Sequence, residues 1–450
     1  MATGWIRSDP SCFDPGAGGT VMAGCPFTLE ADALRDPYPF YEEVRARGTA
    51  VYRPELEAWM VTGYDDVRAI LRQPLIGSSR NPTGPVLART ISDAITRAQA
   101  GNRLPDRVTR ALAEPVDSNL FRVDPPEHTR QRRLISPAFR GTGLRSWEPL
   151  VHRMAADLVD GLVGVEEVDL VARLAVALPV RVIAELLRIP PDDQPLIRRW
   201  SQGNTKVLGN PEATDADLLN TVALRREMAD YFLGLLGQAR ADPADDLLTT
   251  VAEAGTDGPP SGLTESERAG MLTTFMVAGN ETTAKLMAAM LRFLGAQPEL
   301  WRLLDADRTL VAALVEEVLR LEPPTQGMFR LLTEDTRIGK ETVPAGSYVY
   351  LSYAAANRDP DHFPDPGRVD LHRPNLQSHL SFGSGTHLCL GAGLARMEST
   401  VLAATLLERC GGVALSASNT FEHEPTYLLH GLVSLVGTLL PTSASSPVTQ

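Results

Sequence analysis

The 450-residue chain has the composition of an ordinary globular protein, with 43% hydrophobic and 22% charged residues. Its 43 Lys and Arg against 56 Asp and Glu give a formal net charge of −13, which argues against a nucleic-acid-binding protein. The four cysteines show no paired spacing, so we expect a reducing compartment, the cytoplasm, and no disulfide framework. The N-terminus has no apolar core of signal-peptide length, and we expect no membrane association.

One large domain is predicted between two loose ends. Residues 1–28 are rich in Gly, Pro and Ser and are expected to form a leader, as residues 441–450 are expected to form a flexible tail. Between them there is no linker and no internal repeat. We therefore expect residues 29–440 to form a single domain that acts as a monomer.

The fold class is predicted to be mainly α with a minor β part (α+β). Two β-like runs, residues 49–54 and 57–63, are separated by a short turn and predict a hairpin. A further run at 346–353 predicts a strand of the same small sheet. Apolar positions at three and four spacing predict helices over residues 36–48, 65–74, 150–164 and 305–321.

Residues 76–123 stand apart as a long connection that mixes Gly, Pro, Asn and polar residues. Only residues 87–100 favour a short helix there. Long irregular connections in compact domains are often binding loops or lids. A disordered insertion is the equally favoured alternative.

A basic helix is predicted after the two prolines of DPPEHTRQRRL, residues 124–134. His128 and Arg132 lie four residues apart, so both face the same way and could hold a carboxylate. Arg130, Arg133 and Arg140 add a basic patch that would suit an acidic partner. An ordinary solvated face is the alternative for these three.

The longest predicted helix covers residues 265–294 and would run about 45 Å. Thr264 and Glu267 have the spacing of a capping box at its start. Its apolar part is long enough to span a bilayer, but it contains charged residues, so we expect a buried helix. In its middle, Gly279 costs helix stability and favours close approach of a bulky ligand. Glu281 and Thr282 beside it could relay protons, or could be a surface carboxylate and a threonine bonded to its own helix.

The stretch SFGSGTHLCLGAGLAR, residues 381–396, surrounds Cys389 with four glycines just before a predicted helix. A helix N-terminus favours the thiolate, which is a ready metal ligand. The glycines allow a tight turn and let backbone N–H groups approach the sulfur. There is no C-x-x-C-H for covalent haem and no cysteine cluster for iron–sulfur, so a single thiolate on a noncovalent haem fits best.

Phe382, Gly385, His387, Cys389 and Gly391 form the pattern F-x-x-G-x-H-x-C-x-G, which closely resembles the haem-binding loop of the cytochrome P450 family. Further segments resemble family elements in the same order, and the resemblance covers roughly residues 30–440. These segments are DPPEHTRQRRL, AGNETT at 278–283, the E-x-x-R pair at 317–320, and the stretch 357–375 before the haem loop. The resemblance implies a P450-like fold with the haem between the long central helix and the cysteine loop.

The resemblance also implies a role for each matched position. Cys389 would be the metal ligand, the proximal thiolate of haem b (iron protoporphyrin IX). The other cofactor-binding residues would be His128, Arg132, Arg330, Phe382, Gly383, His387 and Gly391. The distal catalytic residues would be Ala278, Gly279, Glu281 and Thr282. Glu317, Arg320 and Arg373 would form a buried structural network. The substrate pocket would include Phe275, Thr325, Met328, Phe329, Tyr427 and Leu428.

The implied activity is that of a monooxygenase that inserts one oxygen atom of O₂ into an apolar organic substrate, such as a natural product or lipid. A separate ferredoxin and an NAD(P)H-dependent ferredoxin reductase would supply electrons, because the chain shows no flavin or iron–sulfur module. The acidic ferredoxin would dock on the face carrying Arg130, Arg133 and Arg396. A peroxide-driven peroxygenase and a non-catalytic haem-thiolate binding or recruitment protein are the alternatives.

Overall fold

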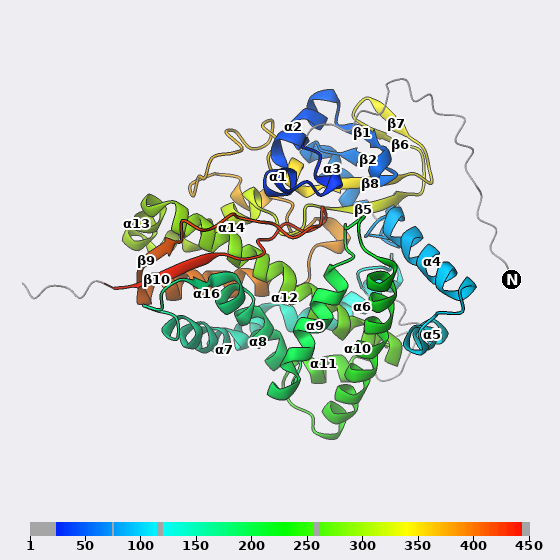
Figure 1. The fold of residues 1–450 in the computed structure, drawn as a ribbon, viewed down its shortest axis with the longest axis horizontal. Helices are drawn as coiled ribbons and strands as arrows, with labels where there is room; N and C mark the ends of the chain where they lie inside the picture. Colours follow the sequence, from blue (N-terminus) through cyan, green and yellow to red (C-terminus); the bar gives the residue numbers. More distant parts are fainter. Residues whose placement is uncertain (1–23, 74–75, 115–119, 256–261, 443–450) are drawn as a thin grey trace, which may run out of the picture.

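The computed structural model describes residues 24–73, 76–114, 120–255 and 262–442. The fold is mainly helical, as predicted, with a small sheet at the top of Figure 1 and helices filling the lower half. The helices are α1 Ala31–Arg35, α2 Tyr38–Arg47, α3 Tyr64–Leu71, α4 Pro85–Ala100, α5 Asp106–Ala113, α6 Glu127–Ile135, α7 Gly141–Asp160, α8 Ala177–Leu186, α9 Gln194–Thr205, α10 Asp215–Ala241, α11 Leu247–Glu253, α12 Glu265–Ala296, α13 Pro298–Ala306, α14 Val311–Leu321, α15 Tyr353–Ala356 and α16 Ala392–Arg409.

The strands form three sheets, of five, three and two strands. The five-stranded sheet has the order β1-β2-β8-β5-β3 and contains the predicted hairpin and the predicted strand near residue 350. The strands are β1 Ala50–Arg53, β2 Ala58–Val61, β3 Gly77–Ser78, β4 Val168–Asp169, β5 Gly327–Leu332, β6 Thr336–Ile338, β7 Glu341–Val343, β8 Tyr348–Ser352, β9 Cys410–Leu415 and β10 Val436–Pro441.

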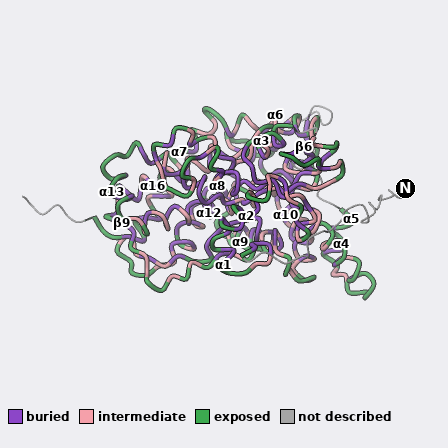
Figure 2. Tube along the Cα trace, turned by 90° about the horizontal axis from the view of Figure 1, so that it is seen from above, coloured by how far each residue is buried: buried purple, intermediate pink, exposed green. Residues whose placement is uncertain are grey.

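Helix α12 runs through the centre of the helical part and packs against α8, α9, α10, α14 and α16. Figure 2 shows that the trace around α8 and α12 is largely buried. The predicted capping box begins this helix, because the Glu267 N–H donates to Thr264 Oγ1 at 3.1 Å and the Thr264 N–H donates to Glu267 Oε2 at 2.8 Å. The helix thus starts where the sequence predicts and crosses the core beneath the small sheet.

Two segments are more ordered than the sequence suggested. The connection 76–123 contains the helices α4 and α5, and α4 is longer than the short helix expected there. Of the expected leader, residues 1–23 lie outside the described residues, but its end is packed: Phe27 is buried against Phe40, Tyr350 and Tyr427. Residues 443–450 of the expected tail also lie outside the described residues.

Among the helices that the structure describes, none combines the length and the apolar character that a bilayer span requires.

Candidate active site

A cavity lies between α12 and the loop that precedes α16, and most of the predicted site residues line it. From α12 come Phe275, Ala278, Gly279 and Thr282, and from α6 come His128 and Arg132. The other predicted residues that line it are Thr325, Met328, Arg330, Phe382, Gly383, His387, Cys389 and Gly391. Segments more than 200 residues apart in the sequence therefore meet around one cavity.

The cysteine loop takes a conformation that needs glycine at two positions. Gly383 and Gly385 have φ values of 70° and 69°, in the left-handed region. A Cβ on Gly385 would lie 2.6 Å from the backbone oxygen of Leu71. The end of α3 therefore leaves no room for a side chain at this position of the loop. The Cys389 N–H donates to the Phe382 carbonyl at 2.9 Å and closes the turn. The loop thus presents the sulfur at the cavity just before α16 begins.

The electrostatics of Cys389 differ from the simple helix-dipole expectation. Burial raises the pKa of the thiol, and this outweighs the lowering by the backbone N–H groups of Gly391 and Ala392 and by the charges of Arg132 and Arg396. The side chain is nevertheless accessible, and it lies in the cavity lining. The raised pKa favours the neutral thiol at neutral pH, and a bound metal cation would favour the thiolate.

Two histidines and two arginines gather at one end of the cavity. The rings of His128 and His387 lie 4.1 Å apart, and the Nε2 atom of each is buried without a hydrogen-bond partner. Burial lowers the pKa of His128 to about 4 and that of His387 to about 3, and neighbouring positive charges add to the effect. Arg132 and Arg330 line the same region. Buried nitrogens without partners beside two cations form a set that fits carboxylates of a bound group.

The residues present fit a haem on three counts. The sulfur of Cys389 faces the cavity, the nitrogens of His128 and His387 lack partners, and the opposite wall is open at Gly279. A Cβ on Gly279 would contact only Ile183 Cδ1, at 3.8 Å, so packing of the chain itself does not require this glycine. A flat ligand lying against α12 explains it, as the sequence predicted.

Glu281 and Thr282, the predicted relay pair, point to different sides of α12. Thr282 lines the cavity and donates from Oγ1 to the Ala278 carbonyl at 2.8 Å. Glu281 instead lines a second recess, together with Asn280, Glu424 and Arg198. It pairs with Lys285 Nζ at 3.4 Å, and burial raises its pKa. Glu281 is thus adjacent in sequence to the cavity-lining Thr282, but its own side chain lines the second recess.

Three residues predicted for the substrate pocket lie elsewhere. Phe329 is fully buried against Tyr350 on the opposite face of β5 from Met328 and Arg330, because neighbouring strand residues point to opposite faces. Tyr427 and Leu428 pack in the same aromatic cluster as Phe27. None of the three is among the residues that line the cavity.

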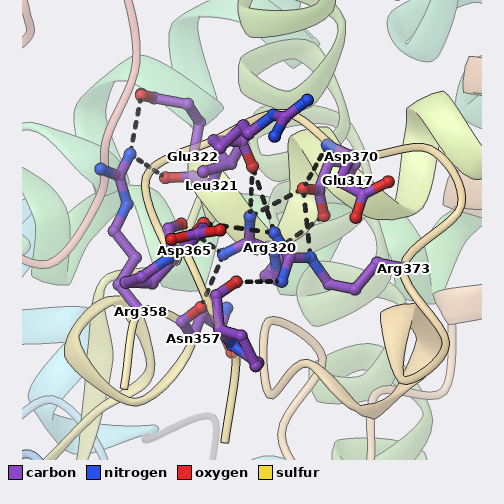
Figure 3. A network of polar contacts seen from close by, with 12 residues as sticks. Glu317, Arg320, Leu321, Glu322, Asn357, Arg358, Asp365, Asp370 and Arg373 are labelled. Carbon is purple, nitrogen blue, oxygen red and sulfur yellow. Dashed lines mark hydrogen bonds and ion pairs between the residues drawn. The ribbon is translucent and has the colours of Figure 1, made fainter. Parts of the chain in front are cut away.

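Glu317, Arg320 and Arg373 form the buried network that the family resemblance implied (Figure 3). Arg320 Nε and Nη2 each lie 2.7 Å from a Glu317 oxygen, and both side chains are fully buried. Arg320 also donates to the carbonyls of Asn357, Pro366 and Arg368, as Arg373 does to that of Pro364. The network therefore fastens the stretch 357–373 to α14 below the cysteine loop.

The predicted basic patch is only partly free. Arg130 pairs with Glu267, and Arg396 makes two hydrogen bonds to Glu316 at 2.6 and 2.9 Å. Arg133 and Arg140 are exposed. The exposed Leu388 of the cysteine loop adds an apolar contact point.

Sequence reasoning missed Glu398 and Phe121, which both line the cavity. Glu398 is 2% exposed, its Oε2 has no hydrogen-bond partner, and burial raises its pKa to about 8. Its position in the second turn of α16, shortly after Cys389, was a usable signal, but a glutamate on a helix is ordinarily solvated. Phe121 follows an irregular stretch, in which no hydrophobic periodicity predicts which side chains face the core.

Comparisons with known proteins agree with this geometry. The family model for cytochrome P450 matches residues 305–411. The chain is 34% identical to cytochrome P450 monooxygenase PikC of Streptomyces venezuelae, over 90% of this chain and 92% of PikC. It is 36% identical to the mycinamicin IV hydroxylase/epoxidase of Micromonospora griseorubida, over 81% of this chain and 85% of that enzyme. The solved structure of CYP109Q5 from Chondromyces apiculatus has a TM-score of 0.77 and 31% identity, covering 92% of this chain and 98% of that one.

The fold and the cysteine-lined cavity define a protein of the haem-thiolate class. The chain belongs to the cytochrome P450 family and is a monooxygenase of the bacterial kind.

Proposed function

We propose that this protein holds haem b through Cys389 and inserts one oxygen atom of O₂ into an apolar organic substrate, of natural-product or lipid-like character. The observation that supports this most directly is the placement of the Cys389 sulfur and the unpartnered His128 and His387 nitrogens around one cavity. The bound haem supplies the oxygen chemistry.

The roles of the chain's own residues follow from their positions. His128, Arg132, Arg330 and His387 would bind the carboxylates of the cofactor, and Cys389 would coordinate its iron. Thr282 holds a hydroxyl at the distal wall, where it can pass a proton by breaking its bond to the Ala278 carbonyl. The apolar side chains of Phe139, Met271 and Phe275 exclude water from the same space.

Electrons would come from a ferredoxin and its NAD(P)H-dependent reductase in the cytoplasm. The exposed Arg133 and Arg140 remain available for an acidic partner. Burial lowers the pKa of Arg132, and the nearby charge of Arg140 lowers it further. The rate of reduction by ferredoxin should fall as the salt concentration rises. At a given salt concentration, the double variant Arg133→Glu/Arg140→Glu should be reduced more slowly than the parent protein. Arg47→Glu on the exposed face of α2 is the matched control, and a salt-independent rate would remove this docking face.

The test of the haem site uses the three described cysteines. Cys389→Ser should abolish the thiolate-type spectrum of the reduced carbonyl complex, while Cys25→Ser and Cys410→Ser should keep it. Titration of the ferric protein with macrolides, steroids and fatty acids should then identify the substrate class by the change in spin state. A thiolate-type spectrum in Cys389→Ser, or its absence from the parent protein, would refute the assignment. Product formation with peroxide alone, at the rate of the full electron-transfer system, would favour a peroxygenase.

A further inference from the structure

The second recess lies on a different side of α12 from the cysteine-lined cavity and has no part in the proposed function. Its volume of about 410 Å³ is within the usual range of small-molecule sites. Its walls come from α8, α9, α12, the π-helical turn Val171–Ala175 and the segment before β10. No described residue lines both spaces, so a ligand in the recess would be a separate molecule from the substrate.

The inner wall of the recess presents hydrogen-bond acceptors from two consecutive residues of α12. Asn280 is 2% exposed, and its amide nitrogen donates to Ser201 Oγ at 2.7 Å and to the Met276 carbonyl at 3.2 Å. These bonds use both amide hydrogens and leave the amide oxygen without a partner among the described residues. Glu281 pairs with Lys285 through Oε2 alone, and its Oε1 receives no hydrogen bond from a described residue. Because an amide oxygen and a carboxylate oxygen can only accept, the matching ligand group is a donor.

The inner wall also carries more negative than positive charge. Two carboxylates, those of Glu281 and Glu424, share the single ammonium group of Lys285, so one negative charge is in excess. Lys285 lies within 2.8 Å of both Glu424 oxygens and is not among the residues that line the recess. Burial raises the pKa of Glu281, and a cation held against this carboxylate would oppose that shift. The charge of the inner wall therefore favours a cationic donor.

Two basic residues at the rim do not remove this excess. The Lys206 ammonium lies 2.7 Å from Asp217 Oδ1 and is neutralised there. Arg198 is exposed and makes no hydrogen bond or ion pair with a described residue. Water and salt screen an exposed charge strongly, so Arg198 weakens the attraction of the inner wall for a cation only slightly.

Apolar side chains cover much of the remaining wall. They are Val171, Val176, Val180, Leu432 and Val433. Val433 is 47% exposed, so part of this apolar surface faces solvent at the mouth of the recess. An apolar chain attached to the cation would cover that surface.

We propose that the second recess binds an organic cation, in which N–H donors of a guanidinium or ammonium group lie against Glu281 and Asn280 and an attached apolar chain covers the valines. This inference goes beyond the proposed function, because the recess lies outside the cavity that would hold the haem. The cation would draw the Glu281 carboxylate away from Lys285, at the residue next to Thr282 in the chain. The ligand would thus be an effector and not a substrate.

The test compares hexylguanidinium with hexylurea, which have similar shapes and differ in charge. A guanidinium group stays protonated at neutral pH, so it does not coordinate haem iron. Calorimetric titration of the haem-loaded protein should show the guanidinium bound at least about tenfold more tightly than the urea. Methylguanidinium should bind more weakly than hexylguanidinium, because it lacks the apolar chain. Equal binding of hexylguanidinium and hexylurea, or no binding of either, would overturn the proposal.

Substitutions around the recess should change the affinity for hexylguanidinium according to their charge. Glu281→Gln and Glu424→Gln should each lower it by about tenfold and leave the affinity for hexylurea unchanged. Arg198→Gln should raise it, because a positive charge leaves the rim. Glu422→Gln is the matched control, since this exposed glutamate does not line the recess. An unchanged affinity in Glu281→Gln, an equal loss in Glu422→Gln, or a loss in Arg198→Gln would contradict the assignment.

Competition with imidazole distinguishes the recess from the cysteine-lined cavity. Imidazole is a ligand of haem iron, and a saturating concentration should leave the affinity for hexylguanidinium unchanged. Displacement of hexylguanidinium by imidazole would place the probe in the cysteine-lined cavity and overturn the proposal. The reduced carbonyl spectrum is recorded for the same protein, and absence of the thiolate-type band would contradict only the proposed function.

Discussion

The Lys285 ammonium lies 2.7 and 2.8 Å from the two carboxylate oxygens of Glu424 and thereby joins α12 to the segment before β10. The stem of Lys285 is held by Gly431, where an added Cβ would lie 2.5 Å from its Cγ. The same ammonium is 3.4 Å from Glu281 Oε2. Lys285 therefore contacts two carboxylates and lies closer to Glu424 than to Glu281.

This sharing predicts opposite effects of two substitutions on Glu281. Burial raises the pKa of Glu281, Lys285 lowers it and Glu424 raises it. Lys285→Met should therefore raise that pKa further, and Glu424→Gln should lower it. A raised carboxyl pKa makes the folded state lose stability as pH rises from the unfolded value towards the folded one. The pH dependence of the free energy of unfolding should be steeper in Lys285→Met and shallower in Glu424→Gln, and slopes that change in the same direction would contradict this.

Glu398 is predicted to reduce stability at neutral pH. Its pKa is raised to about 8 by burial, against an unfolded value near 4.5, so the folded state holds a proton that the unfolded state has lost. Glu398→Gln should stabilise the protein by about 3 kcal/mol at pH 7, from linkage at 1.36 kcal/mol per pH unit. The gain should be small at pH 5, grow up to about pH 8 and then level off. Denaturant unfolding across this range measures it, and a gain independent of pH would count against the protonated carboxyl.

Removing one member of the Glu317–Arg320 pair should be severe. Both side chains are fully buried, and Arg320→Met removes the nearer of the two cations on Glu317, leaving it only Arg373 at 3.4 Å and the Asp370 N–H, so we expect a loss near the lower end of about 3–5 kcal/mol. We expect a lower free energy of unfolding and poor retention of haem. Arg47→Met, which breaks the exposed pair with Glu43, should cost less than about 0.5 kcal/mol. Similar losses in the two variants would show that burial does not set the strength of the network.

Thr282→Ala should impair proton delivery during catalysis while leaving the free energy of unfolding almost unchanged. The hydroxyl bonds only to its own helix at Ala278, so the free energy of unfolding should change by less than about 1 kcal/mol. Electron use should be diverted from product to hydrogen peroxide, measured as peroxide formed per NAD(P)H consumed with a surrogate ferredoxin. Thr283→Ala, at the next cavity-lining position, is the control. If Thr282→Ala forms no more peroxide per NAD(P)H than the parent protein, the Thr282 hydroxyl does not take part in proton delivery.

The features that the sequence predicted correctly are set by residues close together in the chain. The capping box at Thr264, the pair on α6 and the glycine-rich loop around Cys389 each follow from a short motif, and the structure shows all three. The class of the fold followed from the same periodicities.

The rest depended on long-range packing. Phe329 could not be separated from Met328 because the face that a strand residue presents is fixed by the neighbouring strand, here β8. Glu281 and Thr282 look like a pair in the sequence, yet one step on a helix turns the side chain by about 100° and sends them to different hollows.

The packing of Phe27 also fixes where the chain can be shortened. Its ring lies 5.2 Å from Tyr427 and 6.0 Å from Tyr350, in edge-to-face contacts. A version beginning at residue 29, where sequence composition would place the boundary, lacks this ring and exposes the two tyrosines to water. A version beginning at residue 24 keeps the aromatic contact, so crystallisation and partner-fusion work should start from that residue.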